Sequence, residues 1–162
     1  MKIVIDLDNT IINSSKMIYE LYVKDHKINK EYDSNHDWNF SELVDEKDLN
    51  SLLRYFTDKR LYSNIIEMPN AINVIKDLSR NNEIIIITKH HKDRIPITEN
   101  WIKNTFKNVK VHYLNSFDKS KFSGEIFIDD RIDCLESIEG NFNKIICLSE
   151  FDWKERELLI GI

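Results

Sequence analysis

The sequence contains little cysteine, glycine or proline, and it lacks long apolar runs. Its two cysteines, Cys134 and Cys147, lie in apolar segments without the spacing of a metal site, so we expect reduced core thiols rather than a disulfide. With three glycines and two prolines among 162 residues, it has no linker, repeat or low-complexity segment. No stretch approaches the ~18 apolar residues of a membrane span, and the first residues lack the flanks of a signal peptide. These absences predict a cytoplasmic protein with no membrane partner.

The net charge of −5 also limits the partners of this chain. An acidic protein does not cover a nucleic-acid backbone with lysine and arginine, so we expect no stable nucleic-acid complex. A small phosphorylated substrate held through a metal ion is compatible with this charge. Hydrophobic residues make up 41% of the chain, which is enough for a core. The length favours one domain with a small inserted lobe, and a homodimer remains open.

Apolar runs alternate with segments of helical periodicity along the chain. We predict strands where short apolar runs occur, at residues 1–6, 83–88, 109–114, 125–130 and 144–148. We predict helices from Ser14 or Ser15 as the N-cap, from the region 41–45 onward, and at about 71–78, 96–106 and 152–160. This alternation predicts the α/β class, with a Rossmann-like parallel sheet of about five strands and helices on both faces.

The polar and helical residues 13–66 interrupt this alternation after the first strand. We interpret them as a small helical cap, with residues 1–12 and 67–162 forming the core domain. Trp38, Phe40 and Tyr62 are its notable aromatic residues. Trp38 and Phe40 are expected in the core of the cap. Tyr62, near the exit from the cap, is a candidate substrate-binding residue that could stack on a base or exclude water.

Acidic residues follow two of the predicted strands, at Asp6 and Asp8 and at Asp129 and Asp130. Because the carboxyl ends of parallel strands meet at one edge of a sheet, these carboxylates should converge there. Carboxylates so close repel one another unless a cation lies between them, and hard oxygen ligands favour Mg²⁺. Asp6 and Asp8 alone could be turn or capping residues. The second acidic pair favours metal-centred phosphoryl chemistry instead.

Four segments in order resemble the motifs of the haloacid dehalogenase (HAD) superfamily of phosphatases. They are Asp6-Leu7-Asp8-Asn9-Thr10, Thr88 after an isoleucine run, a loop lysine at Lys119, and Ile128-Asp129-Asp130-Arg131. Within the superfamily, the chain is most similar to the 5'(3')-deoxyribonucleotidases through residues 118–131, Leu61-Tyr62, Met68-Pro69-Asn70-Ala71 and Trp101-Ile102. The chain departs from that family at Asn9 and Asn70, where glycine is usual, and at Lys89-His90-His91, where small residues are common.

The resemblance implies a role for each of these residues. Asp6 would attack phosphorus, and Asp8 would protonate the leaving oxygen and then activate water. Thr88 and Lys119 would bind the phosphate oxygens. The Mg²⁺ ligands would be Asp6, the backbone carbonyl of Asp8, and at least one of Asp129 and Asp130.

Several neighbouring residues have less specific expectations. Lys121 is the rival of Lys119, but we interpret it as a solvated loop residue. Arg131 is expected to pair with an acid near the site. His90 and His91 are expected to be exposed, with contact to the leaving group as the alternative.

Together these features predict a Mg²⁺-dependent phosphomonoester hydrolase that forms an aspartyl-phosphate, most similar to a nucleoside monophosphate phosphatase. The alternatives are a phosphatase for another small metabolite or for a nucleic-acid 3'-phosphate, and a non-catalytic binding module.

Overall fold

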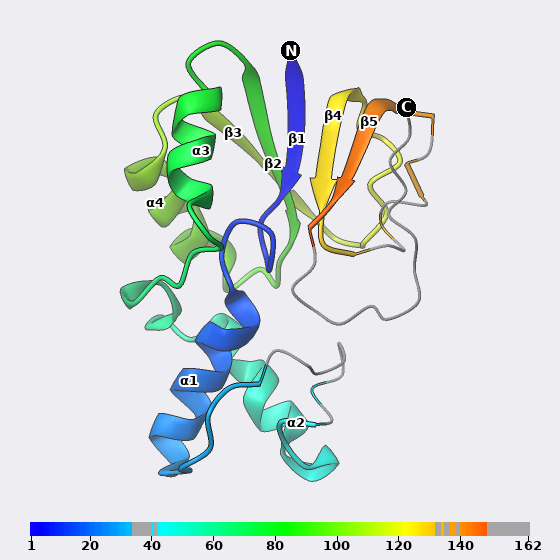
Figure 1. Cartoon of the computed structure of the whole chain (residues 1–162). Coiled ribbons are helices and arrows are strands. Elements are labelled where there is room, and N and C mark those ends of the chain that lie inside the picture. Colours follow the sequence, from blue (N-terminus) through cyan, green and yellow to red (C-terminus); the bar gives the residue numbers. More distant parts are fainter. Residues whose placement is uncertain (34–39, 41, 132–133, 135–136, 139, 149–162) are drawn as a thin grey trace.

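A single five-stranded parallel sheet forms the centre of the protein (Figure 1). The computed structural model describes residues 1–33, 40, 42–131, 134, 137–138 and 140–148. The strand order is β3-β2-β1-β4-β5, which confirms the predicted α/β class and the predicted number of strands. The strands are β1 (Lys2–Asp6), β2 (Glu83–Lys89), β3 (Val109–Leu114), β4 (Gly124–Asp129) and β5 (Phe142–Cys147).

Both faces of the central strands are buried because their apolar side chains alternate between two hydrophobic clusters. Ile3 and Ile5 point toward α3 (Ala71–Leu78) and α4 (Ile95–Thr105), which lie on one face (Figure 1). Val4 points to the opposite face, where it belongs to a cluster with Ile85, Ile87, Phe127, Ile138 and Phe142. A strand that is apolar on both sides is what a central parallel strand requires.

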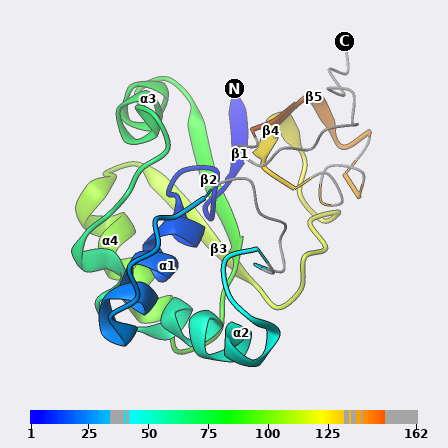
Figure 2. The same cartoon turned by 60° about the horizontal axis from the view of Figure 1, so that its bottom comes forward.

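The described helices and turns within residues 14–63 form a helical segment that lies beyond the carboxyl edge of the sheet, as Figures 1 and 2 show. Its core side chains, including Ile18, Leu52 and Leu61, join the same cluster as the α3–α4 face of the sheet. This position suits the predicted cap, whose boundaries stay a prediction. Its elements are α1 (Ser14–His26), α2 (Glu46–Leu53) and the 3₁₀ turns η1 (Arg54–Thr57) and η2 (Leu61–Ser63).

Two predicted helix starts are wrong by a few residues. Asn13, not Ser14 or Ser15, caps α1, because its side-chain oxygen accepts a hydrogen bond from the Lys16 amide at 3.0 Å. α2 begins at Glu46, after Asp45 in the extended conformation, and not in the region 41–45. The predicted helix 152–160 and the predicted cap residue Trp38 lie outside the described residues.

Two departures from the resembling family occur at residues with a left-handed backbone. Asn9 has φ 56° and Asn70 has φ 60°, a conformation that glycine adopts most readily and that asparagine tolerates better than most residues. The two substitutions therefore keep the backbone geometry that glycine would allow.

Two expectations from composition can also be compared with the structure. Cys134 and Cys147 are both thiols, as expected. In the described parts of the chain, no helix has the length and apolar character needed to span a bilayer.

Candidate active site

Three of the four predicted acidic residues, Asp6, Asp129 and Asp130, meet where the chain changes direction across the sheet, whereas the Asp8 side chain is not part of this cluster. From β1 the chain passes to β2 on one side and later returns to β4 on the other, which makes this a topological switch point where α/β proteins bind ligands. Ile5 pairs with Ile128, so the next residues, Asp6 and Asp129, lie side by side at the carboxyl edge. Thr88 follows Ile87, the partner of Asp6 on β2.

Asp6, Asp129 and Asp130 form a buried carboxylate cluster. One oxygen of each lies within 4.8 Å of the others. Asp130 Oδ1 accepts a hydrogen bond from Thr10 Oγ1 at 3.2 Å, while Asp130 Oδ2 is buried without a hydrogen-bond partner among the described residues. Burial and the Asp6 and Asp129 charges raise the pKa of Asp130 well above its ordinary value. A divalent cation among these oxygens would let them all ionise, and the unpartnered oxygen fits such a ligand role.

Lys119 joins two members of this cluster. Its Nζ donates hydrogen bonds to Asp6 Oδ1 and Asp129 Oδ2, both at 2.5 Å, and its side chain is 2% exposed. The loop bends at this point because the Asp118 side chain accepts a hydrogen bond from the Ser120 amide at 2.9 Å. Burial alone would lower the pKa of Lys119, but the Asp6 and Asp129 charges hold it above its usual range. Lys119 is therefore an ammonium that faces the acidic cluster.

The two aspartates of the Asp129-Asp130 pair differ in how their oxygens are used. Asp129 accepts from Lys119 with Oδ2 and from the Arg131 backbone amide with Oδ1, at 2.9 Å. Both of its oxygens are thus engaged, whereas Asp130 keeps one oxygen unpartnered within the described structure. The Arg131 guanidinium lies 4.1 Å from the centre of the Phe117 ring. The predicted pairing of Arg131 with an acid stays a prediction.

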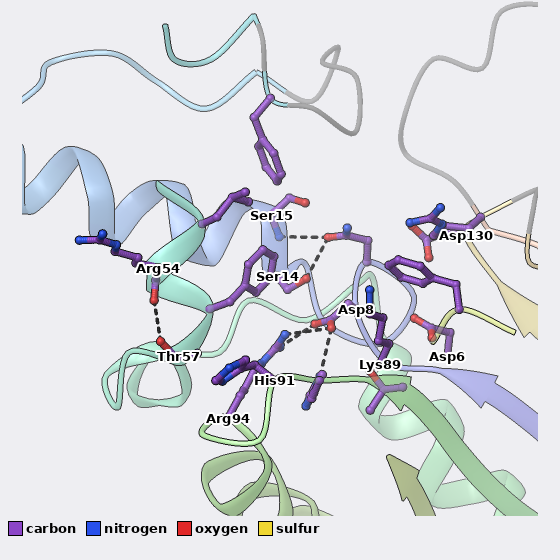
Figure 3. A pocket seen from close by; sticks show the side chains of 18 of the residues that line it. Asp6, Asp8, Ser14, Ser15, Arg54, Thr57, Lys89, His91, Arg94 and Asp130 are labelled. Carbon is purple, nitrogen blue, oxygen red and sulfur yellow. Dashed lines mark hydrogen bonds and ion pairs between the residues drawn. The ribbon is translucent and has the colours of Figure 1, made fainter. Parts of the chain in front are cut away.

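Asp8 occupies a different environment from Asp6. Arg94 donates to both of its oxygens, from Nη2 to Oδ1 at 2.6 Å and from Nη1 to Oδ2 at 3.0 Å. His90 Nε2 lies 3.1 Å from Asp8 Oδ2. Burial alone would raise the pKa of Asp8, but Arg94 and His90 outweigh this effect and hold it far below its usual range. Figure 3 shows the Asp8 carboxylate turned toward Arg94, while Asp6 and Asp130 lie on the other side.

The carboxylates open into a cavity of about 800 Å³ between the sheet edge and the helical segment (Figure 3). Its inner wall includes the predicted residues Asp6, Asp8, Thr88, Lys119 and Asp130. The opposite wall comes from the segment after β1 and is partly apolar. It includes Phe40, Asn50, Leu53, Arg54, Phe56 and Thr57. The cavity thus joins a charged end, suited to phosphate, to an apolar end.

The aromatic residues predicted for the cap have distinct positions. Phe40 is buried in the hydrophobic cluster, as expected, and also lines the cavity. The Tyr62 hydroxyl lies 2.8 Å from Thr98 Oγ1 and accepts a hydrogen bond from Arg94 Nη2 at 3.1 Å. Tyr62 is not among the described residues that line the cavity, so its predicted substrate contact stays a prediction.

Two predictions about loop residues are confirmed and one is wrong. Lys121 is exposed, and so is His91, whose side chain is 60% exposed. His90, by contrast, is buried at 9% exposure. Both histidines were expected to be exposed because they lie in a loop. Neighbouring residues on an extended chain point to opposite sides, so only one of the pair can reach Asp8, and that residue is His90.

The sequence did not reveal Arg94 or His90 as partners of Asp8. Arg94 is 3% exposed and immediately precedes α4. No spacing motif marks it, because its approach to Asp8 depends on how α4 packs on the sheet. The usable signal was weaker: a lone arginine in front of Ile95-Pro96, at the start of a predicted helix that follows a site strand.

Comparisons with known proteins agree with this geometry. The family model described as 5' nucleotidase, deoxy (pyrimidine), cytosolic type C protein (NT5C) matches residues 1–153. No curated protein sequence matches the chain.

Solved structures of hydrolases, two of them described as HAD hydrolases, share the fold. HAD-hydrolase YfnB of Bacillus subtilis, bound to magnesium, has a TM-score of 0.55 at 13% identity, over 99% of this chain and 92% of that one. A subfamily IA HAD hydrolase of Geobacter sulfurreducens has a TM-score of 0.54 at 12% identity, over 91% and 89%. A hydrolase of Streptococcus pneumoniae has a TM-score of 0.50 at 14% identity, over 84% and 86%.

The fold, the acidic edge of the sheet and the family model agree, and the last of these covers nearly the whole chain. The chain belongs to the cytosolic type C 5'-nucleotidase family and is a phosphatase with the HAD fold.

Proposed function

We propose that this protein is a Mg²⁺-dependent phosphomonoester hydrolase that acts on a deoxynucleoside monophosphate through an aspartyl-phosphate on Asp6. The observation that carries the proposal is the buried cluster of Asp6, Asp129 and Asp130, bridged by Lys119 and open to one cavity. Three ionised carboxylates and one ammonium leave a charge of minus two. One divalent cation neutralises that charge.

The residues present fit such an ion. Asp6, Asp130 and the backbone carbonyl of Asp8 would hold it, and Asp129 would instead fix Lys119, since both Asp129 oxygens are already engaged. When bound, Mg²⁺ neutralises charge on the phosphate and on the cluster.

In the first step, a carboxylate oxygen of Asp6 bonds to phosphorus while the bond from phosphorus to the ester oxygen breaks. Lys119 and Thr88, both buried against the cavity, neutralise and hydrogen-bond the phosphate oxygens. Asp8 donates a proton to the leaving oxygen and therefore has to be protonated in the substrate complex, whereas Arg94 and His90 hold the pKa of its carboxyl far below the usual range when no substrate is bound. In the second step, Asp8 accepts a proton from the water that attacks phosphorus, and the bond from phosphorus to Asp6 breaks.

The apolar end of the cavity supports a substrate with a planar base. Phe40, Leu53 and Phe56 line the cavity from the helical segment and offer the contact area that a nucleobase prefers. The proposed cap, residues 13–66, would close this end. The cytosolic type of the family supports the predicted cytoplasmic location.

The test is hydrolysis by the purified protein of a panel of deoxynucleotides, ribonucleotides, sugar phosphates and a 3'-phosphorylated oligonucleotide, with Mg²⁺ or with EDTA. We expect Mg²⁺-dependent phosphate release, fastest with deoxynucleoside monophosphates. A preference for sugar phosphates would reassign the substrate and leave the mechanism in place. If no monoester is hydrolysed when Mg²⁺ is supplied, the proposal is wrong.

A further inference from the structure

Asp8 belongs to a closed ring of hydrogen bonds whose other members come from the loop between β2 and α4, from α4 itself and from η2. The ring runs through Arg94, Tyr62, Thr98 and His90 and returns to Asp8. Its links are 2.6–3.1 Å long. The Asp8 carboxylate therefore has a fixed orientation before any substrate is present.

The direction of each hydrogen bond follows from the chemistry of the groups. The Asp8 carboxylate can only accept, so His90 Nε2 donates to it, and the neutral His90 ring then accepts at Nδ1 from the Thr98 hydroxyl. The Thr98 oxygen accepts from the Tyr62 hydroxyl, which accepts from Arg94 Nη2. The Thr98 hydroxyl has a second acceptor, the Arg94 backbone carbonyl at 3.1 Å, and Arg94 Nε is buried without a hydrogen-bond partner among the described residues. Each member of the ring forms two of its hydrogen bonds, so turning any one member breaks both.

Arg94 is the member with the most contacts. Its planar guanidinium forms two parallel hydrogen bonds to Asp8, a geometry that lysine cannot reproduce. It also lies 5.1 Å from the centre of the Phe56 ring in η1, and it bonds to Tyr62 in η2. Arg94 thus touches Asp8 and two turns of the helical segment, and it lines the cavity itself.

We propose that Arg94 is a positioning residue that orients the Asp8 carboxyl group for proton transfer to the ester oxygen and from the attacking water, with Tyr62 linking this orientation to the helical segment. This inference rests on the proposed function of the site. The Arg94 side chain donates its hydrogen bonds to Asp8 and Tyr62, and in the described part of the structure it forms none with Asp6, Thr88 or Lys119. Its loss should therefore affect proton transfer and leave attack on phosphorus unchanged.

Esters with different leaving groups separate these two steps. The leaving group of a nucleoside 5'-monophosphate is an alkoxide, which needs a proton. The leaving group of p-nitrophenyl phosphate is a stable phenolate, which does not. Positioned proton transfer contributes roughly 10²–10⁴-fold to rates. The second step is common to both esters, so the comparison uses the first turnover, in which Asp6 becomes phosphorylated. For Arg94→Ala we expect the first-turnover release of nucleoside from the nucleotide to fall at least ~100-fold, with a fall of less than ~5-fold in the first-turnover release of p-nitrophenolate.

Three further measurements distinguish positioning from a purely structural role. Added guanidinium ion should restore part of the nucleotide activity of Arg94→Ala, because Arg94 borders the open cavity. Tyr62→Phe removes the two hydrogen bonds of the Tyr62 hydroxyl and should show the same selectivity at smaller size, several-fold in the first-turnover rate. Arg80→Ala is the matched control, because Arg80 is exposed just after α3 and forms a surface ion pair with Asp77 at 3.2 Å. It should change neither substrate.

The outcomes can be assigned without ambiguity. Equal losses on both esters, or a loss confined to KM, would overturn the inference. If Arg94→Ala does not fold, Arg94→Lys and Tyr62→Phe carry the same comparison of leaving groups. If the wild-type protein hydrolyses neither ester, the proposed function fails. If it hydrolyses both and the variants keep its ratio, only the role of Arg94 fails.

Discussion

The exchange of Lys119 for methionine tests the charge balance of the acidic cluster most directly. The substitution keeps the length of the side chain but leaves Asp6 and Asp129 facing each other without the ammonium that lies 2.5 Å from each. Removing one partner of a buried ion pair costs about 3–5 kcal/mol. We expect the free energy of unfolding in EDTA at pH 8 to fall by about that amount, and by less near pH 6, where Asp6 can take up a proton.

Mg²⁺ should reverse much of this loss. Without Lys119 the ionised cluster carries three negative charges, so a divalent cation should bind it more tightly than it binds the wild-type cluster. Ligand at 100 times its dissociation constant stabilises a protein by about 2.7 kcal/mol. Mg²⁺ should therefore raise the unfolding free energy of Lys119→Met more than that of the wild type. Turnover should still fall roughly 10²–10³-fold, because the charge on the phosphate loses a partner.

The assay is urea unfolding followed by tryptophan fluorescence, with EDTA or with Mg²⁺. Lys110→Met is the control, because Lys110 forms one ion pair with Glu83 at 2.6 Å on the exposed surface, where such pairs contribute about 1 kcal/mol or less. If Lys119→Met loses no more than this control in EDTA, or if Mg²⁺ stabilises both proteins equally, the cluster is not balanced as described.

Three other predictions concern the same edge of the sheet. Asp6→Asn should abolish turnover on every ester while the circular dichroism spectrum stays unchanged, and residual turnover near the wild-type level would remove Asp6 as the nucleophile. Asp130→Asn should raise the Mg²⁺ concentration needed for half-maximal activity more than Asp129→Asn does, measured by metal titration; the reverse order would exchange their roles. Burial, opposed by Lys119 but aided by Asp129 and Asp8, raises the pKa of Asp6 to about 7 from 3.8. The folded metal-free protein therefore binds more protons than the unfolded chain between these values, so its stability should fall as pH rises from 4 to 7. Unfolding curves in EDTA that show rising stability over this range would contradict the shift.

Local sequence patterns were enough for the sheet and for the acidic site. The isoleucine-rich runs predicted β1 and β2 because strands buried on both faces need apolar residues at every position. Asp6, Asp129 and Asp130 could be predicted to meet because parallel strands place equivalent ends together. Lys119 and Thr88 depended on the resemblance, since a single lysine or threonine is common in any loop.

Features set by tertiary packing could not be predicted in this way. The N-cap of α1 is Asn13 and not a serine, because several neighbouring residues can cap a helix and the preceding loop determines which of them does. The burial of His90 and the pairing of Arg94 with Asp8 depend on the position of α4 against the helical segment. A hydrogen-bonded ring assembled from three separate parts of the chain, Asp8, Tyr62 and residues 90–98, leaves no periodic trace in the sequence.

The left-handed turn at Asn9 has a mechanical consequence for the loop that carries Asp8. Its side-chain oxygen accepts hydrogen bonds from the Ser15 amide at 3.0 Å and from the Ser14 hydroxyl at 3.3 Å. Glycine would permit the same turn but has no side chain that could accept hydrogen bonds from the first residues of α1. The Asn9 side chain therefore couples the orientation of the first turn of α1 to the peptide next to Asp8.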